Sequence, residues 1–197
     1  MARTGRPREF DRDSAVDAAM NLFWEKGFES TSLADLRKTL GNLSSASFYA
    51  AFGSKQALFE ECLARYTESC GAVSAVLDNT DMAPKAAMKA MLYDTISVQT
   101  SPQSPAGCMA VLSGLNCLDE NKEVEALTRQ VRQQTRDAIG RCVARAVAAN
   151  ALKGINADAY TLMLDCFVKG IAIEAKDGAS EAMLKASAEQ LLQLWQE

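Results

Sequence analysis

The sequence of residues 31–55 predicts two helices that are too short to be stable on their own. This stretch limits the possible folds more than any other part of the chain. Ser32 and Asp35 have the spacing of a capping box, which starts a helix. Leucines then recur at helical spacing and give this helix one apolar side: Leu33, Leu36 and Leu40. We therefore expect both helices to pack against neighbouring helices.

Gly41 and Asn42 are expected to end the first short helix, because these residue types enter the left-handed backbone conformation most easily. Ser44 can cap the second short helix, whose apolar side carries Phe48 and Phe52. Two helices joined by a turn of about 3–4 residues form a helix-turn-helix, a motif that places its second helix in the major groove of DNA. The pattern therefore indicates a DNA-binding unit.

A longer helix should precede this motif. Asp11 or Asp13 can cap that helix, and Gly27 can end it. The three helices then share a small apolar core, which we expect to contain Leu22, Phe23, Leu33, Leu36, Leu40, Phe48 and Phe52.

Residues 10–63 resemble the DNA-binding domain of the TetR/AcrR family of transcriptional regulators. Three stretches carry the resemblance, in the family's order and at its intervals: LFWEKGF (22–28), TSLADL (31–36) and SFYAAFGSKQALF (47–59). The resemblance implies an all-α fold in which an N-terminal helix-turn-helix domain is followed by a helical domain for effector binding and dimerisation.

We expect the arm and the DNA-binding domain in residues 1–55 and the second domain in residues 56–197, with a linking helix over about 54–77. Further helices are predicted from the apolar spacing and from breaks at Pro, Gly and Ser, for a total of about nine. Their ranges are 84–99, 106–117, 121–150, 157–177 and 180–196.

The resemblance also implies which residues contact DNA. Tyr49 would direct its hydroxyl at the DNA backbone, and Lys55 would lie beside the duplex; a core aromatic and a solvated surface charge are the alternatives. Thr31 and Ser32 would offer hydroxyl and amide donors to another phosphate. The full set expected in this motif is Thr31, Ser32, Ser44, Ser45, Ala46, Ser47, Tyr49, Ala50 and Lys55.

Positive charge is scarce where the resemblance implies a DNA contact. Residues 44–51 contain no Lys or Arg, so the common bidentate contact of arginine with guanine is not available from this helix. Residues 1–55 hold eight basic and seven acidic residues, a net charge of +1, and residues 56–197 carry −5. The basic N-terminal arm with Arg3, Arg6 and Arg8 can supply charge by entering the minor groove. A disordered tail is the alternative for this arm.

Composition argues against several other classes of protein. The 197 residues include no histidine, so the chain has no histidine base and no ordinary zinc site, and we expect neither enzyme activity nor a cofactor or metal. Six cysteines lack C-x-x-C spacing, which favours free thiols in a reducing compartment. No apolar run reaches the ~20 residues of a membrane span. We therefore expect a cytoplasmic protein without a membrane partner.

The last two predicted helices carry apolar side chains over a broader surface than one core face needs. In the family these helices pair with their copies, so the resemblance implies a homodimer; packing within one chain is the alternative. The residues expected at this interface are Tyr160, Leu164, Val168, Ile171, Met183, Leu184, Leu191 and Trp195.

Family members also hold an effector between the linking helix and the dimer helices, which implies a small-molecule ligand here. The candidate lining residues are Met88, Met91, Leu92, Tyr93, Cys108, Met109, Met163 and Phe167. Methionine-rich walls adapt to ligands, although such residues more often form ordinary core. This set includes no cluster of charges, which favours an apolar ligand.

Cys108 follows a Pro/Ser segment and lies close to a predicted helix N-terminus, a position that lowers the pKa of a thiol. It is a candidate sensor of oxidants or electrophiles, with an inert buried thiol as the alternative. Taken together, the sequence predicts a dimeric repressor that is released from a palindromic double-stranded operator by a small apolar effector or by thiol modification. An all-helical scaffold or partner-binding module without DNA binding is the second hypothesis.

Overall fold

The computed structural model describes residues 11–69 and 72–195. Within these ranges the chain forms nine α-helices and three 3₁₀ segments and contains no β-strand, which confirms the all-α fold. The elements in chain order are α1 (Arg12–Lys26), α2 (Leu33–Thr39), α3 (Ser45–Phe52), α4 (Lys55–Ser69), η1 (Ala72–Asp78), α5 (Pro84–Gln99), α6 (Met109–Leu112), η2 (Asp119–Asn121), α7 (Lys122–Ala148), α8 (Ala157–Lys176), α9 (Glu181–Leu191) and η3 (Leu192–Leu194).

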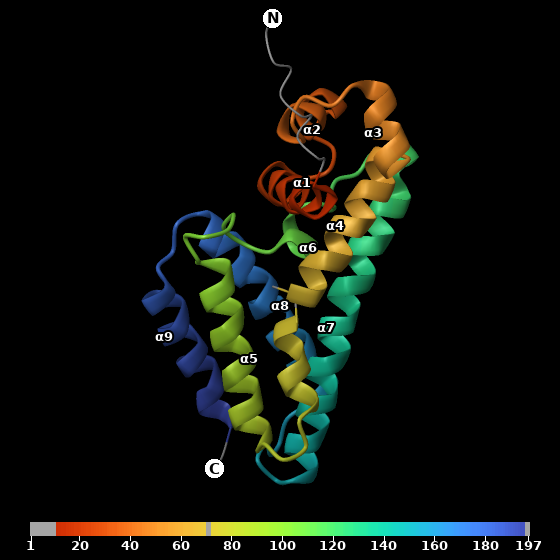
Figure 1. The fold of residues 1–197 in the computed structure, drawn as a ribbon. Helices are drawn as coiled ribbons and strands as arrows, with labels where there is room; N and C mark the ends of the chain where they lie inside the picture. Colours follow the sequence, from red (N-terminus) through yellow and green to blue (C-terminus); the bar gives the residue numbers. More distant parts are fainter. Residues whose placement is uncertain (1–10, 70–71, 196–197) are drawn as a thin grey trace, which may run out of the picture.

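The first three helices form a small unit at one end of the molecule, with the longer helices α5, α8 and α9 toward the other end (Figure 1). Helix α4 leads from this unit toward the larger group, and α7 runs along nearly the whole length of the molecule. Among the described helices, none combines the length and apolar character that crossing a membrane requires.

The ends of the short helices form as their sequence predicts. The Ser32 side chain accepts a hydrogen bond from the Asp35 amide, and the Asp35 carboxylate accepts one from the Ser32 amide, so the capping box is complete. Gly41 and Asn42 both have a positive φ, 84° and 60°, in the turn between α2 and α3. Ser44 then caps α3 by accepting a bond from the Ser47 amide.

The core of the N-terminal unit contains most of the expected residues. Phe23, Leu36, Leu40, Phe48 and Phe52 are buried, whereas the expected core residues Leu22 and Leu33 are only partly buried at its edge. The same core continues beyond α3 into α4 and takes in two residues of α6, Met109 and Ala110. The N-terminal unit therefore depends on a segment that lies about fifty residues further along the chain.

The linking helix is shorter than expected. α4 ends at Ser69, and the chain from Ala72 to Asp78 is the 3₁₀ segment η1, so the prediction of one helix over 54–77 is wrong for its last turns. Exposed ion pairs hold α4 against α1: Arg12 contacts Glu61, and Arg65 contacts both Asp13 and Asp17.

The other predicted helices differ in how closely their predicted ranges agree with the structure. The expected range 84–99 coincides with α5, and α7 and α8 begin and end within two residues of prediction. The helix expected over 106–117 is reduced to the single turn of α6. Gly107 explains part of this difference, because its φ of 87° is incompatible with a right-handed helix. Helix α9 ends at Leu191 and continues only as η3.

Most residues predicted at the dimer interface lie inside the chain instead. Six of them are buried in the larger core and so cannot form the surface that meets a partner: Tyr160, Leu164, Val168, Ile171, Leu184 and Trp195. Leu191 is partly buried and packs against this core. The Trp195 indole donates a hydrogen bond to the Tyr160 hydroxyl at 2.7 Å within this core. Met183 is the exception, with 65% of its surface exposed. The sequence pattern marked these helices as apolar but did not separate their inner side from their outer side.

The turn geometry predicts how position 42 responds to mutation. Replacing Asn42 by alanine should lower the free energy of unfolding by about 1 kcal/mol, because a Cβ disfavours the left-handed conformation. Replacement by glycine should be neutral or slightly stabilising. Urea denaturation measures both changes, with Asn21→Ala on the exposed side of α1 as the matched control. Equal losses for the alanine variants at positions 42 and 21 would contradict this account.

Candidate DNA interface and effector cavity

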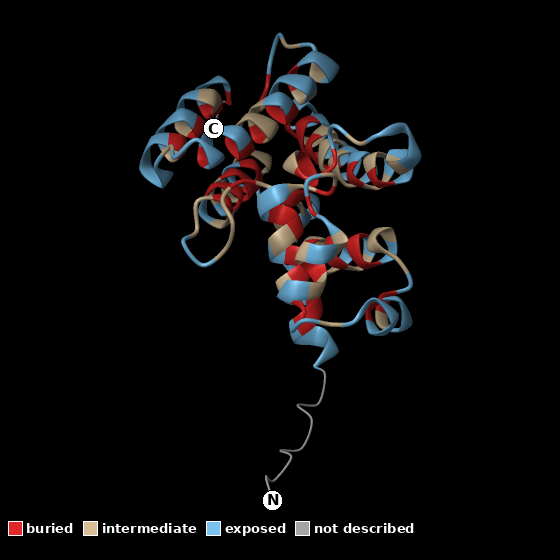
Figure 2. Ribbon diagram, turned by 90° about the horizontal axis from the view of Figure 1, so that it is seen from above, coloured by how far each residue is buried: buried red, intermediate tan, exposed pale blue. Residues whose placement is uncertain are grey.

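The outward side of α3 is open to solvent. Six of the predicted DNA-contact residues are exposed there: Ser44, Ser45, Ala46, Ser47, Tyr49 and Ala50. Figure 2 colours the ribbon by burial and shows exposed segments on the helices at this end of the molecule. Phe48 and Phe52 anchor the opposite side of α3 in the core, and the Tyr49 ring packs edge-on against Phe48 at 5.6 Å. Tyr49 is 51% exposed, so the alternative of a core aromatic is wrong.

Thr31 and Ser32 differ in their exposure to solvent. Thr31 is fully buried, and its hydroxyl donates a 2.7 Å hydrogen bond to the carbonyl oxygen of Gly27. The prediction that the Thr31 hydroxyl contacts a phosphate is therefore wrong. The hydroxyl instead links the end of α1 to the start of α2. Ser32 is exposed at the N-terminus of α2.

Lys55 is partly buried rather than freely solvated. Its Nζ atom lies 4.1 Å from the centre of the Phe28 ring, an arrangement that favours a cation over the ring face. Desolvation lowers the pKa of Lys55, and the nearby Glu29 opposes this effect. The lysine thus remains at the start of α4, next to the N-terminal unit, with part of its surface in contact with that unit's core.

Sequence reasoning missed a residue that shapes the turn before α3. Arg37 donates a 2.7 Å hydrogen bond from Nε to the carbonyl oxygen of Leu43 and so ties the turn to α2. Lys38 follows it and is exposed. Both lie in the last turn of α2, where the helix dipole favours cations. Their position at the end of a predicted helix is the sequence signal that could have identified them. The predicted arm residues Arg3, Arg6 and Arg8 lie outside the described residues.

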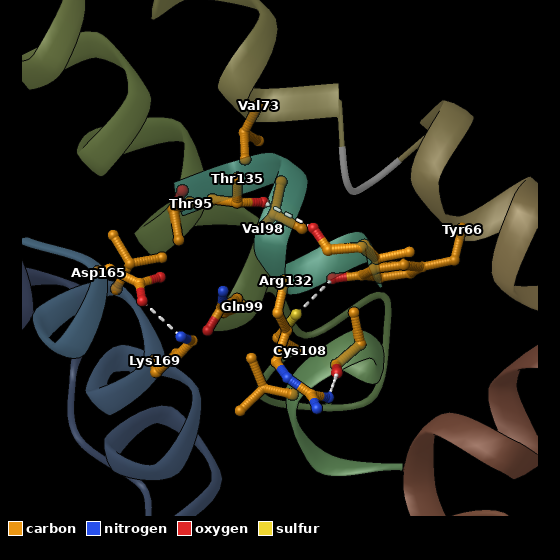
Figure 3. Close-up of a pocket in the computed structure, with 14 residues that line it drawn as sticks. Tyr66, Val73, Thr95, Val98, Gln99, Cys108, Arg132, Thr135, Asp165 and Lys169 are labelled. Atoms are coloured by element: carbon orange, nitrogen blue, oxygen red, sulfur yellow. Dashed lines mark hydrogen bonds and ion pairs between the residues drawn. The ribbon is translucent and has the colours of Figure 1, made fainter. Parts of the chain in front are cut away.

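A cavity of about 60 Å³ lies between α4, α5, α6, α7 and α8 (Figure 3). Of the eight predicted ligand residues, only Cys108 lines it. Met88, Met91, Leu92 and Met109 are fully buried in the two cores. Tyr93 and Phe167 pack against the larger core from its edge, and Met163 is exposed on α8. The methionines thus fill irregular core space, the alternative that the sequence left open.

The cavity contains charged side chains, which corrects the expectation of an uncharged site. Arg132, Asp165 and Lys169 all line it. Lys169 Nζ lies 2.5 Å from Asp165 Oδ2. Arg132 donates a 2.6 Å hydrogen bond to the carbonyl oxygen of Ala110, and desolvation lowers its pKa. The sequence did not indicate this group, because the three residues are spread over two helices, α7 and α8.

Cys108 is less acidic than its sequence position suggests. Burial raises the pKa of its thiol, although a hydrogen bond from the Tyr66 hydroxyl to Sγ at 3.1 Å acts in the opposite direction. Helix α6 is only one turn long, so little helix dipole is available to stabilise a thiolate. The expected lowering of this pKa is therefore wrong.

Helix α6 and its flanks connect the cavity to the N-terminal unit. Cys108, Ala110 and Val111 line the cavity, and Ala110 also belongs to the core of that unit. On the other side, the Trp24 indole donates a 3.1 Å hydrogen bond to the carbonyl oxygen of Gly107. The Phe28 amide donates one to the carbonyl oxygen of Ser113 at 2.8 Å. The two ends of the α6 segment are therefore fixed to α1 and to Phe28, two residues beyond the end of α1.

Comparisons with known proteins agree with this architecture. The family model described as "Bacterial regulatory proteins, tetR family" matches residues 15–62. The chain is 31% identical to the HTH-type transcriptional repressor ComR of Escherichia coli (strain K12), over 98% of this chain and 92% of ComR. It is 29% identical to the repressor BdcR of the same organism, over 93% and 88% of the two chains.

A solved structure is similar over nearly the whole chain. It is a cysteine mutant of the TetR family transcriptional regulator CifR in complex with 26 bp operator DNA, with a TM-score of 0.86 and 32% identity, covering 96% of this chain and all of the other. The chain therefore belongs to the TetR family of bacterial transcriptional regulators. It is a DNA-binding transcriptional regulator, of a family whose members act as homodimers, and the hypothesis of a scaffold without DNA binding is not supported.

The burial of the cysteines predicts how fast they react. Iodoacetamide near pH 8 should label Cys108 at least about tenfold more slowly in the folded protein than in the protein unfolded in urea, because the thiolate is the reactive form and a raised pKa reduces its population. Burial also raises the pKa of the Cys62 thiol to about 12, so Cys62 should react slowly as well.

Peptide mass spectrometry over time measures these rates in both states. Equal labelling of Cys108 in the folded and the unfolded protein would contradict the assignment of Cys108 as a protected thiol.

Proposed function

We propose that the protein is a repressor that binds a palindromic operator as a homodimer and is released when a small molecule fills the cavity beside α6. The observation that carries this proposal is the position of α6, which forms a wall of the cavity and part of the core of the helix-turn-helix unit. Repression is supported by the similarity to ComR and BdcR, which are both repressors by name.

Helix α3 is the proposed recognition helix. Its exposed serines and alanines offer hydroxyl contacts to bases and apolar contacts to thymine methyl groups, whereas Tyr49 and Lys55 hold the phosphate backbone. Because α3 itself carries no charge, we assign additional phosphate or minor-groove contacts to the arm residues Arg3, Arg6 and Arg8. The affinity for DNA should then depend on several separated contacts rather than on one strong contact between a side chain and a base.

The proposed dimer surface is the outer side of α8 and α9. Large apolar side chains are exposed there although the inner side of each helix is already buried: Leu162, Met163, Ile173 and Met183. Phe167 and Met183 also border a shallow hollow between the two helices, which can receive side chains from a partner. A two-fold dimer would place two recognition helices about 34–36 Å apart, the spacing of successive major grooves on one side of a duplex.

Release is proposed to follow from a change at α6. A ligand that fills the cavity displaces Cys108, Ala110 or Val111, and the hydrogen bonds at Gly107 and Ser113 transmit this shift to α1 and Phe28. A rotation of the N-terminal units then changes the separation of the two recognition helices. The effector and the operator are thereby coupled through one element. Thiol modification at Cys108 is the less favoured route, because burial keeps this thiol protonated.

Three further assignments belong to this proposal. We place the protein in the cytoplasm and give it no catalytic role, supported by its regulator relatives. We also retain the division into residues 1–55 and 56–197, although the first core extends through α4, which favours counting the start of α4 with the DNA-binding unit.

Two substitutions test the DNA contacts with the DNA upstream of the protein's own gene. Tyr49→Phe should weaken binding about tenfold, because it removes one hydroxyl bond to the backbone and keeps the ring on Phe48. Lys55→Gln should reduce the slope of log affinity against log salt by about one. Fluorescence anisotropy at several salt concentrations measures both. Tyr93→Phe, on α5, is the matched control and should leave binding unchanged; unchanged binding by both test variants would remove α3 and α4 from the interface.

One substitution tests the dimer surface. Ile173→Asp should convert the dimer into a monomer, because it places a charge in the centre of the proposed apolar contact. Light scattering coupled to gel filtration measures the mass. Leu118→Asp is the matched control, since Leu118 is 60% exposed and lies outside α8 and α9. If Ile173→Asp remains a dimer, the outer side of α8 is not the interface.

A further inference from the structure

We propose that the cavity takes a small uncharged molecule that donates hydrogen bonds from hydroxyl groups to two buried oxygen atoms, Oε1 of Gln99 and Oδ1 of Asp165. This inference rests on the proposed function, since it names the chemical class of the effector for the same site.

The two oxygen atoms are buried acceptors that have no donor among the described residues. Gln99 is 5% exposed and Asp165 is 1% exposed, and both side chains line the cavity (Figure 3). The other carboxylate oxygen of Asp165 is occupied by Lys169. Buried polar atoms in folded proteins are nearly always hydrogen-bonded, because an unpaired one keeps its desolvation cost. Two such acceptors in one cavity therefore indicate a ligand that supplies donors.

The charges in the cavity favour a neutral donor. Arg132 and Lys169 are positive and Asp165 is negative, so the group has a net charge of +1. An ammonium group would add a third positive charge to a site of low polarity, and an ionised carboxylate has no donor to offer the two oxygens. A hydroxyl group donates without bringing a charge. We therefore assign hydroxyl groups rather than amines or acids.

The remaining walls define the rest of the molecule. Valines from five elements line the cavity: Val73, Val98, Val111, Val131 and Val168. Such walls bind a hydrocarbon body, and a cavity of about 60 Å³ limits that body to a few carbon atoms unless the helices move apart. The ligand class is thus a short or compact alcohol, in which each hydroxyl group donates to one of the two oxygen atoms, that of Gln99 or that of Asp165.

Three matched probes test the class with the full-length protein: cyclopentanol, cyclopentanone and cyclopentylamine. They share one carbon ring and differ in whether the polar group donates without charge, accepts only, or carries a positive charge. Calorimetric titration should show that cyclopentanol binds about tenfold or more tightly than the other two, because only it pairs a buried acceptor without adding charge. Equal or tighter binding of the ketone or the amine would overturn the inference, and so would the absence of binding by all three.

Asp165→Asn provides a second test, because it should reduce the preference. Lys169 still requires an acceptor, so the amide oxygen would stay on Lys169 and the amide NH₂ would face the cavity as a donor. The ketone and the alcohol can both accept a hydrogen bond from this NH₂, so the advantage of the alcohol should shrink to what donation to Gln99 provides. Asp158→Asn, at an exposed position on the same helix, is the matched control and should keep the wild-type ratio of the two affinities. A variant at position 165 that is folded and keeps the wild-type ratio would contradict the assignment.

Gln99→Leu is the second variant, in case Asp165→Asn fails to fold. It should weaken binding of cyclopentanol and leave binding of cyclopentanone nearly unchanged; equal effects on both would overturn the role of Gln99. Operator binding is measured in parallel. If the alcohol binds in the predicted order but does not release DNA, the hydroxyl class holds and the effector role in the proposed function fails. If DNA binding is intact and the order is wrong, only the ligand class fails.

Discussion

The structure depends on one short helix, α6, that belongs to the core of the N-terminal unit and also forms part of the cavity wall. Met109 and Ala110 of α6 complete the apolar core of the helix-turn-helix unit, and Ala110 and Val111 form a wall of the cavity. Hydrogen bonds from Trp24 and Phe28 fix both flanks of α6 to the N-terminal unit. Since packed cores transmit small displacements instead of absorbing them, a change in the cavity has a direct route to the DNA-binding helices.

The proposed recognition helix, α3, has a different physical character. Its exposed side carries small and hydroxylated residues, and its position is set by contacts that lie beneath it: the buried rings of Phe48 and Phe52, the cap at Ser44 and the bond from Arg37 to the turn. A helix without charge can approach the duplex closely, but it draws little affinity from phosphates. Function then requires accurate placement of two such helices, which makes the distance between them a sensitive point of control.

The sequence was sufficient for the local features and insufficient for the shared ones. Caps, the left-handed turn at Asn42 and the bounds of α5, α7 and α8 follow from residue type and spacing, and the structure agrees. The cavity was missed because Gln99, Arg132 and Asp165 come from three helices and no spacing rule links them. The inner and outer sides of α8 were confused because both are apolar, and periodicity alone does not tell which side meets the core.

The central claim is that filling the cavity weakens operator binding through α6, and a substitution tests it without any ligand. Val168 lies on α8 at the cavity wall, away from the DNA-binding unit, so Val168→Phe would fill the space from the opposite side. We predict that operator affinity, measured by fluorescence anisotropy, falls at least about tenfold, whereas Val168→Ala leaves it unchanged. A folded, dimeric Val168→Phe variant that binds the operator as tightly as the wild type would contradict the account.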